Sequence, residues 1–149
     1  MNKYYSISFL FILLVSMLSC SKDSLVNVVP GIKYLGVSDD DITEFDDSLI
    51  VDLEYSDGDG DLGELNPDIN SLYIKDRRLA EADFYFIKPL APPDSKIQIK
   101  GQLRIRIKNT FLLGTGNSEK TVFSIKLRDR AGNWSNTVET HEITIHKKP

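Results

Sequence analysis

The chain alternates apolar and polar residues with a period of two in four separate segments. The clearest alternation runs through residues 49–56, where Leu, Val, Leu and Tyr alternate with Ile, Asp, Glu and Ser. The same period returns in residues 102–108, 123–128 and 141–146. Such alternation buries one face of a strand and leaves the other in water, as in antiparallel sheets. The pattern therefore predicts an all-β chain.

Shorter strands are expected at residues 32–37, 71–75 and 84–87, which brings the total to about seven. Turn-rich stretches separate them, and residues 76–83 form the one helical candidate, of one or two turns. Many short strands at this spacing predict an antiparallel β-sandwich of immunoglobulin (Ig) or fibronectin type III kind over residues 31–149. A small barrel is the alternative.

The outward faces of two expected strands carry opposite charges. Asp52 and Glu54 face out on one strand, and Arg104, Arg106 and Lys108 face out on another. If these strands are neighbours, the charges can pair across the ladder, each pair contributing about 0.2–1 kcal/mol. The alternative is a basic stripe that binds an anionic ligand.

The first 19 residues predict a signal helix that is followed by a lipid attachment site. Lys3 precedes a short apolar run over residues 7–18, which is too short for a membrane span. The run ends in Met17-Leu18-Ser19-Cys20, which resembles the lipobox of bacterial lipoproteins. The resemblance implies lipidation of Cys20, with residues 20–30 as a tether. An ordinary signal peptide followed by a chance cysteine is the alternative.

Lys22-Asp23 resembles the short signal that sends lipoproteins of Bacteroidota to the surface of the outer membrane. We therefore expect a lipid-anchored, surface-exposed protein of the outer membrane. The formal net charge of −4 argues against a nucleic-acid partner. Cys20 is the only cysteine, so neither a disulfide nor a thiolate metal site is expected in the domain.

Two further segments resemble Ig-like and fibronectin III-like surface lipoproteins of Bacteroidota. Residues 129–136 read Asp-Arg-Ala-Gly-Asn-Trp-Ser-Asn and resemble the turn that closes the penultimate strand of such domains. Residues 55–63 end a strand in Asp-Gly-Asp-Gly-Asp-Leu-Gly, which resembles a recurring acidic loop. The resemblance implies fold and location, but no specific chemistry.

The acidic loop is the principal candidate site. Alternating aspartates with intervening glycines can wrap their oxygens around Ca²⁺, which takes six to eight oxygen ligands. The start of the loop is like that of an EF-hand, but its sixth position is Leu62 rather than glycine, so an EF-hand is not expected. A polar turn without a cation is the alternative. The expected calcium ligands are Asp57, Asp59, Asp61, Glu64, Asp68 and Asp129.

Trp134, the only tryptophan, lies in the closing turn. It is expected either to contact a glycan or protein partner or to fold back over the end of the core. His141 and His146 are five residues apart and would point to opposite faces of one strand, so they do not predict a shared metal site.

The sequence contains no motif typical of a catalytic site. We expect a non-enzymatic binding or adhesion module, anchored at the surface and stiffened by Ca²⁺. One alternative is a structural accessory subunit of an envelope or nutrient-uptake complex. A small hydrolase is the least favoured alternative.

Overall fold

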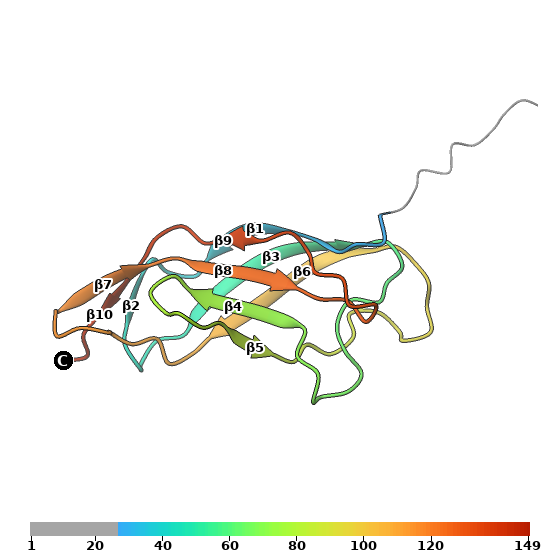
Figure 1. Cartoon of the computed structure of the whole chain (residues 1–149). Coiled ribbons are helices and arrows are strands. Elements are labelled where there is room, and N and C mark those ends of the chain that lie inside the picture. The colour runs from blue at the N-terminus through green and yellow to red at the C-terminus, as the bar shows by residue number, and fades with distance from the viewer. Residues whose placement is uncertain (1–26) are drawn as a thin grey trace, which may run out of the picture.

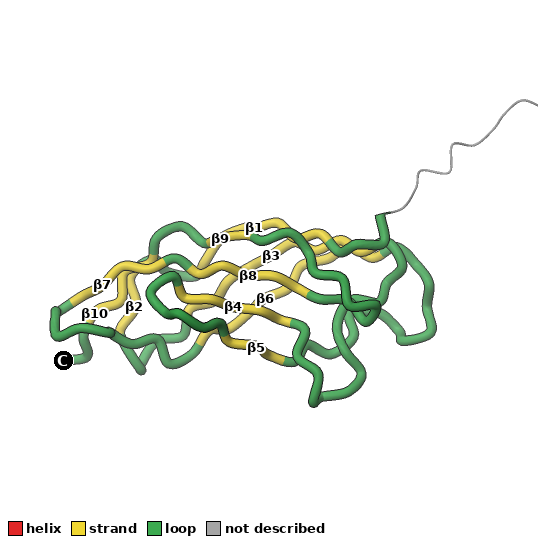
Figure 2. The backbone as a smooth tube through the Cα atoms, viewed as in Figure 1, coloured by secondary structure: helices red, strands yellow, loops and turns green. Residues whose placement is uncertain are grey.

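The computed structural model describes residues 27–149, and every regular element in this range is a β-strand (Figure 2). The prediction of an all-β chain is therefore confirmed for the described residues. The expected signal helix and Cys20 lie outside this range. The strands are β1 (Gly31–Val37), β2 (Asp41–Thr43), β3 (Leu49–Asp57), β4 (Leu72–Asp76), β5 (Asp83–Tyr85), β6 (Ile99–Ile107), β7 (Ser118–Thr121), β8 (Phe123–Leu127), β9 (Val138–Glu139) and β10 (Ile143–His146).

The strands form three open sheets (Figure 1). One sheet has the order β1-β3-β6 and a second has the order β5-β4-β8-β9, and both are antiparallel throughout. The third has the order β2-β10-β7, in which β2 runs parallel to β10. Only Val122 separates β7 from β8, so these two strands follow each other almost without interruption.

The inward faces of the sheets meet in one apolar core. Leu49, Val51 and Leu53 of β3 alternate inward and are fully buried. Ile125 and Leu127 of β8 belong to the same cluster, with at most 1% of either residue exposed. Burying one such side chain stabilises the folded state by about 1.5–3 kcal/mol. The alternation seen in the sequence thus corresponds to the buried and exposed faces of the strands.

Outward charges of β3 pair with those of β6, and of the expected pairs the one between Asp52 and Arg104 forms. Arg104 donates two hydrogen bonds to the carboxylate of Asp52, at 2.8 and 3.1 Å. Glu54 pairs with Lys100 at 3.2 Å. Because these pairs are exposed to solvent, they contribute little to stability.

The expected helix over residues 76–83 is wrong. This segment is a turn between β4 and β5, in which the amide of Leu79 donates to the carbonyl of Asp76 at 3.0 Å. The amide and the guanidinium of Arg78 both donate to the Asp76 carboxylate. These local side-chain bonds give the backbone an alternative to a helix.

Residues 27–149 contain ten strands, where the sequence predicted about seven. The additional strands are β2, β7 and β9, which have three, four and two residues. Each contains at most one apolar residue, so no alternation marks it in the sequence.

The connecting loops gather at two opposite ends of the molecule (Figure 1). The chain enters β1 at one end, where Gly31 pairs with Ser56 at the end of β3. The acidic loop that follows β3 is therefore beside the start of the first strand. The C-terminus lies at the opposite end, where β10 pairs with the start of β7.

Candidate cation site

Asp57 is the last residue of β3 and lies on the inward face of that strand. The strand alternates with a period of two, so the carboxylate follows the same inward direction as Val51 and Leu53. Only 2% of Asp57 is exposed. A carboxylate buried to this extent requires hydrogen bonds or a cation to offset its lost hydration.

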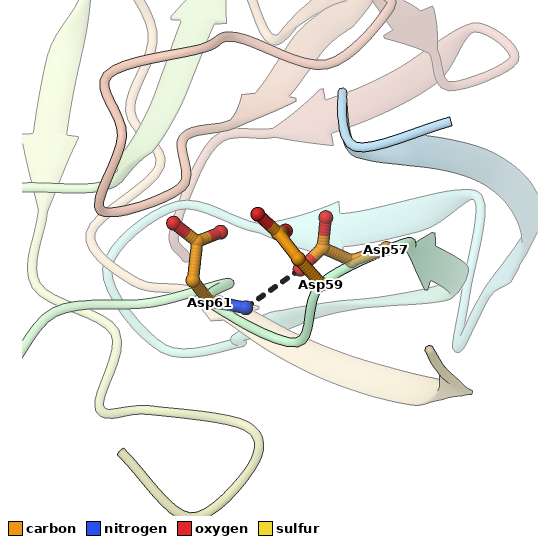
Figure 3. A group of neighbouring side chains, drawn as sticks. All are labelled: Asp57, Asp59 and Asp61. Atoms are coloured by element: carbon orange, nitrogen blue, oxygen red, sulfur yellow. Dashed lines mark hydrogen bonds between the residues drawn. The ribbon is translucent and has the colours of Figure 1, made fainter. Parts of the chain in front are cut away.

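The loop after β3 is closed by its first aspartate. The amide of Asp61 donates to Oδ2 of Asp57 at 2.8 Å (Figure 3). Between them, Gly60 adopts a φ of +76°, and a Cβ at this position would lie 2.6 Å from the carbonyl oxygen of Ile97. Figure 3 shows that the closed loop turns the side chains of Asp57, Asp59 and Asp61 to the same side. One carboxylate oxygen from each lies within 4.8 Å of the other two.

Three carboxylate oxygens in this loop are buried without a partner. They are Oδ1 of Asp57, Oδ1 of Asp59 and Oδ1 of Asp61, none of which accepts a hydrogen bond. Leaving a buried charged acceptor unpaired destabilises a fold by more than the 1–3 kcal/mol typical of neutral groups. A cation bound between these oxygens would satisfy all three.

The carboxylates of the loop repel one another. Burial raises the pKa of Asp57, and the neighbouring charge of Asp59 raises it further. Burial also raises the pKa of Asp61, with the charge of Asp129 as the next largest cause. None of the ion pairs formed by residues 27–149 includes these loop aspartates. The nearby guanidinium of Arg130 donates to two backbone carbonyl groups instead.

Asp129 holds the closing turn in place from a fully buried position. Its Oδ1 accepts a hydrogen bond from the amide of Asn133 at 2.6 Å, and its Oδ2 accepts one from Nδ2 of the same residue at 2.9 Å. Gly132 supplies the positive φ that the turn requires, +92°. Both carboxylate oxygens of Asp129 therefore have partners, unlike those of the acidic loop.

The closing turn packs directly on the acidic loop. The amide of Arg130 donates to the carbonyl of Asp61, and the amide of Ala131 donates to its Oδ2, both at 3.1 Å. Leu62 and Asp129 form an isolated β-bridge between the two segments. The two stretches singled out in the sequence thus meet in space, as expected for turns at one end of the fold.

Glu64 and Asp68, the other two expected ligands, are not part of the cluster formed by Asp57, Asp59 and Asp61. Oε1 of Glu64 lies 3.4 Å from Nη2 of Arg128. Asp68 is exposed, and its amide donates to the side chain of Asn66.

Asp94 was not anticipated as a neighbour of the site. It lies in the long connection before β6 and lines a surface hollow together with Asp59 and Asp61. Lys96 and Arg130 line the same hollow. The sequence offered only a weak signal, because Asp94 is more than 30 positions from the acidic loop and follows two prolines.

Trp134 is half-buried on the outward side of the sheet β5-β4-β8-β9. Its ring packs edge-on against Tyr73 and Phe84, with 6.4 Å between ring centroids in both pairs. It therefore does not project freely from the turn.

The two histidines interact with a second acidic run at the other end of the fold. His141 bonds to Asp40 through Nε2 and to the hydroxyl of Tyr34 through Nδ1. His146 bonds to Asp41 at 2.8 Å. The histidines do not share a site, in agreement with their spacing in the sequence.

Cys20, the expected lipidation residue, lies outside the described residues. Within residues 27–149, no helix has the length and apolar character that crossing a membrane requires. Comparison of the chain with protein-family models, with curated proteins and with solved structures found no match.

Proposed function

We propose that the chain is a non-enzymatic lipoprotein of the outer-membrane surface, a binding or adhesion module whose single domain is stiffened by Ca²⁺. The calcium ligands are the carboxylates of Asp57, Asp59 and Asp61. The observation that carries this proposal is the set of three buried, unpartnered oxygens in the acidic loop.

The donor set suits Ca²⁺ better than other common cations. All three side chains offer hard carboxylate oxygens, which Ca²⁺ and Mg²⁺ prefer to nitrogen or sulfur ligands. Ca²⁺ tolerates irregular geometry and six to eight ligands, whereas Mg²⁺ demands a near-ideal octahedron. A short loop with its glycine fixed against Ile97 supplies oxygens from one side, which leaves the remaining coordination positions of the cation to water.

The position of the site explains how Ca²⁺ would stiffen the module. The acidic loop contacts the closing turn through Asp61, and β3 ends beside the first residue of β1. A cation bound in the acidic loop would restrain this loop, and through it the closing turn and the start of β1. If Cys20 is lipidated, this end is the one nearest the membrane.

The strand order supports an Ig-like or fibronectin III-like sandwich. If β7 and β8 count as one strand, and β9 and β10 as another, seven main strands remain besides β2. The three-stranded sheet β1-β3-β6 and the four-stranded sheet β5-β4-β8-β9 then resemble the two layers of such domains, which have about seven strands. Both contribute to one core, as the layers of a sandwich do.

Calorimetric titration with Ca²⁺ tests the metal site. We expect one site with a Kd of about 0.1–1 mM, the range of extracellular calcium modules. Asp59→Asn should abolish binding without disturbing the loop, because no hydrogen bond of the described chain involves the Asp59 side chain, unlike that of Asp57. Asp68→Asn is the matched control and should bind as the wild type does. Absence of heat up to 10 mM Ca²⁺, or equal binding by Asp59→Asn, would refute the site.

The anchor is tested separately in cells. Cys20→Ser should release the protein from the membrane fraction and prevent incorporation of a labelled fatty acid, because the thiol is the expected acceptor. Unchanged labelling of the variant would show that the lipid is attached elsewhere or not at all. Neither result depends on the calcium titration.

A structural accessory subunit is the second candidate, and one observation favours it. Phe45 lies at the end of the fold opposite the acidic loop, is 61% exposed and stacks on Phe111 with 6.3 Å between centroids. Its φ of 61° is unusual for a bulky residue, and such strained positions cluster at functional sites. A photo-crosslinker at position 45 that captures one envelope protein, with a crosslinker at position 116 as control, would favour this candidate.

A further inference from the structure

The outward face of the sheet β5-β4-β8-β9 has an unusual composition for a solvated sheet surface. Strand register places Tyr73 of β4 between Phe84 of β5 and Lys126 of β8 on this face. Lys75 is two positions farther along β4 and opposite Ser124, so it faces outward too. We call this surface the aromatic–basic face: Tyr73, Phe84, Trp134, Lys75 and Lys126.

The three rings of the aromatic–basic face form a contiguous cluster. Tyr73 and Phe84 meet edge-to-face at 5.5 Å, and each also contacts Trp134 edge-on. Phe84 is 48% exposed, whereas the other two rings are half-buried. Nζ of Lys126 lies 4.3 Å from the Tyr73 ring centroid and 5.2 Å from that of Trp134. The cluster thus combines apolar ring surface with a positive charge held over it.

The opposite outward face, on β3 and β6, shows what an ordinary solvated surface of this domain looks like. There Arg104 pairs with Asp52, and Lys100 pairs with Glu54. Arg106 of that face, however, takes part in none of the ion pairs of the described chain. Beside the aromatic–basic face, Arg128 pairs with Glu64 and Arg77 pairs with Glu139 of β9. Lys75 and Lys126 form no ion pair in the described chain, so their ammonium groups remain open to an anionic partner.

We propose that the aromatic–basic face binds an acidic polysaccharide whose sugar rings carry carboxylates. The exposed ring of Phe84 offers apolar surface to the C–H bonds of a sugar, and the ammonium groups of Lys75 and Lys126 can pair with its carboxylates. Charge complementarity therefore selects an anionic glycan over a neutral one. This assignment deepens the proposed binding module by naming its ligand class, but it does not depend on the calcium site.

Two other occupants fit the face less well. The rings pack against one another on a flat sheet rather than on a protruding loop, so they cannot insert into a bilayer. A stable protein interface buries about 800 Å² on each partner around a dry apolar centre. Here the ammonium of Lys126 lies above two rings at the centre of the cluster. A charged group at this position is unfavourable in a dehydrated protein interface but can contact a carboxylate.

The test is a titration of the purified protein with polygalacturonate in EGTA, followed by fluorescence. Trp134 is the only tryptophan, so its emission reports on this face directly. We expect saturable binding with a change in emission, which neutral dextran does not produce. Lys126→Gln should weaken binding by tenfold or more, and Lys75→Gln by a smaller factor. Lys100→Gln, on the opposite face, is the matched control and should leave binding unchanged.

Three outcomes would overturn the proposal. The first is no change in emission with polygalacturonate. The second is equal binding by Lys126→Gln, Lys75→Gln and wild type, which would place the ligand elsewhere. The third is a response to anionic phosphatidylglycerol vesicles without one to polygalacturonate, which would make the face a membrane contact. Unfolding curves of each variant show whether a loss of binding reflects a loss of fold. Because the titration is carried out in EGTA, its result does not depend on whether the acidic loop binds Ca²⁺.

Discussion

The acidic loop depends, at the scale of single residues, on one glycine. Gly60 combines a positive φ with a close approach to the carbonyl of Ile97, so a side chain there meets both backbone strain and a steric clash. Since Gly60 lies between Asp59 and Asp61, the same conformation aims both carboxylates at the cluster. The glycine is thus part of the site although it contributes no side-chain ligand.

We expect Gly60→Ala to lower the free energy of unfolding by about 1–3 kcal/mol, the typical cost of a strained backbone position. Urea unfolding curves measure this difference. Gly36→Ala is the matched control, because a Cβ there would meet no atom within 4 Å and φ is not positive. Equal stability of the two variants would show that the loop conformation is not constrained at Gly60.

The stability of the fold also depends on pH through Asp61. Burial and the charges of Asp129 and Asp59 raise the pKa of Asp61 above its ordinary value of 3.8. The folded state therefore binds the proton more tightly than the unfolded state, and stability is lost as pH rises from about 3.8 through the raised pKa.

In metal-free buffer at pH 7, Asp61→Asn should therefore be more stable than the wild type, and the difference should vanish at acidic pH. Thermal unfolding at a series of pH values measures it. The variant keeps a carbonyl oxygen that can accept the hydrogen bond from Ala131. A variant less stable than the wild type at pH 7 without metal would contradict the assigned repulsion.

At the scale of elements, the connection between β4 and β5 is held by a half-buried ionic network. Arg78 pairs with Asp76 at 2.7 Å and with Glu119 of β7 at 2.6 Å, and only 12% of its side chain is exposed. Burial raises the pKa of Asp76, but hydrogen bonds from Arg78 and Thr121 outweigh this and keep the pKa below its ordinary value. The network therefore links the turn after β4 to the neighbouring sheet.

We expect Arg78→Met to cost about 1.5–3 kcal/mol, because it removes the charged hydrogen bonds to the half-buried carboxylate of Asp76. The neighbouring Arg77→Met should cost less than about 1 kcal/mol, since that side chain is 63% exposed and its partner is 3.8 Å away. Chemical denaturation of both variants gives the comparison. A small loss from Arg78→Met would mean that the network does not hold this connection.

The long strands were predictable because each shows three or more alternating positions, as in residues 49–53 of β3. The helix predicted at residues 76–83 is replaced by a turn with local hydrogen bonds from Arg78 to Asp76. The unforeseen β2, β7 and β9 show no alternation that sequence could reveal. In the site, spacing alone predicted that Asp57, Asp59 and Asp61 converge. Spacing could not predict that Glu64 lies 3.4 Å from Arg128, which is 64 positions away, or that Asp94 lines the same hollow as Asp59 and Asp61.

At the scale of the whole molecule, the features that could carry function are separated in space. The acidic loop and the start of β1 share one end, and the C-terminus lies at the other (Figure 1). Phe45 lies near the C-terminus, because the amide of the preceding Glu44 donates to the carbonyl of His146. The aromatic–basic face covers one side of the sheet between them. A tethered module with a stiffened base and a binding face along its side is consistent with this arrangement.

Thermal unfolding of the protein in EGTA and in millimolar Ca²⁺ tests whether Ca²⁺ neutralises the buried carboxylates. A ligand at 100 times its Kd adds about 2.7 kcal/mol to the stability of the folded state. For a domain of this size we expect Ca²⁺ to raise Tm by several degrees, and Asp59→Asn to remove most of that rise. An unchanged Tm at 10 mM Ca²⁺ would show that the acidic loop does not bind Ca²⁺ and is a polar turn.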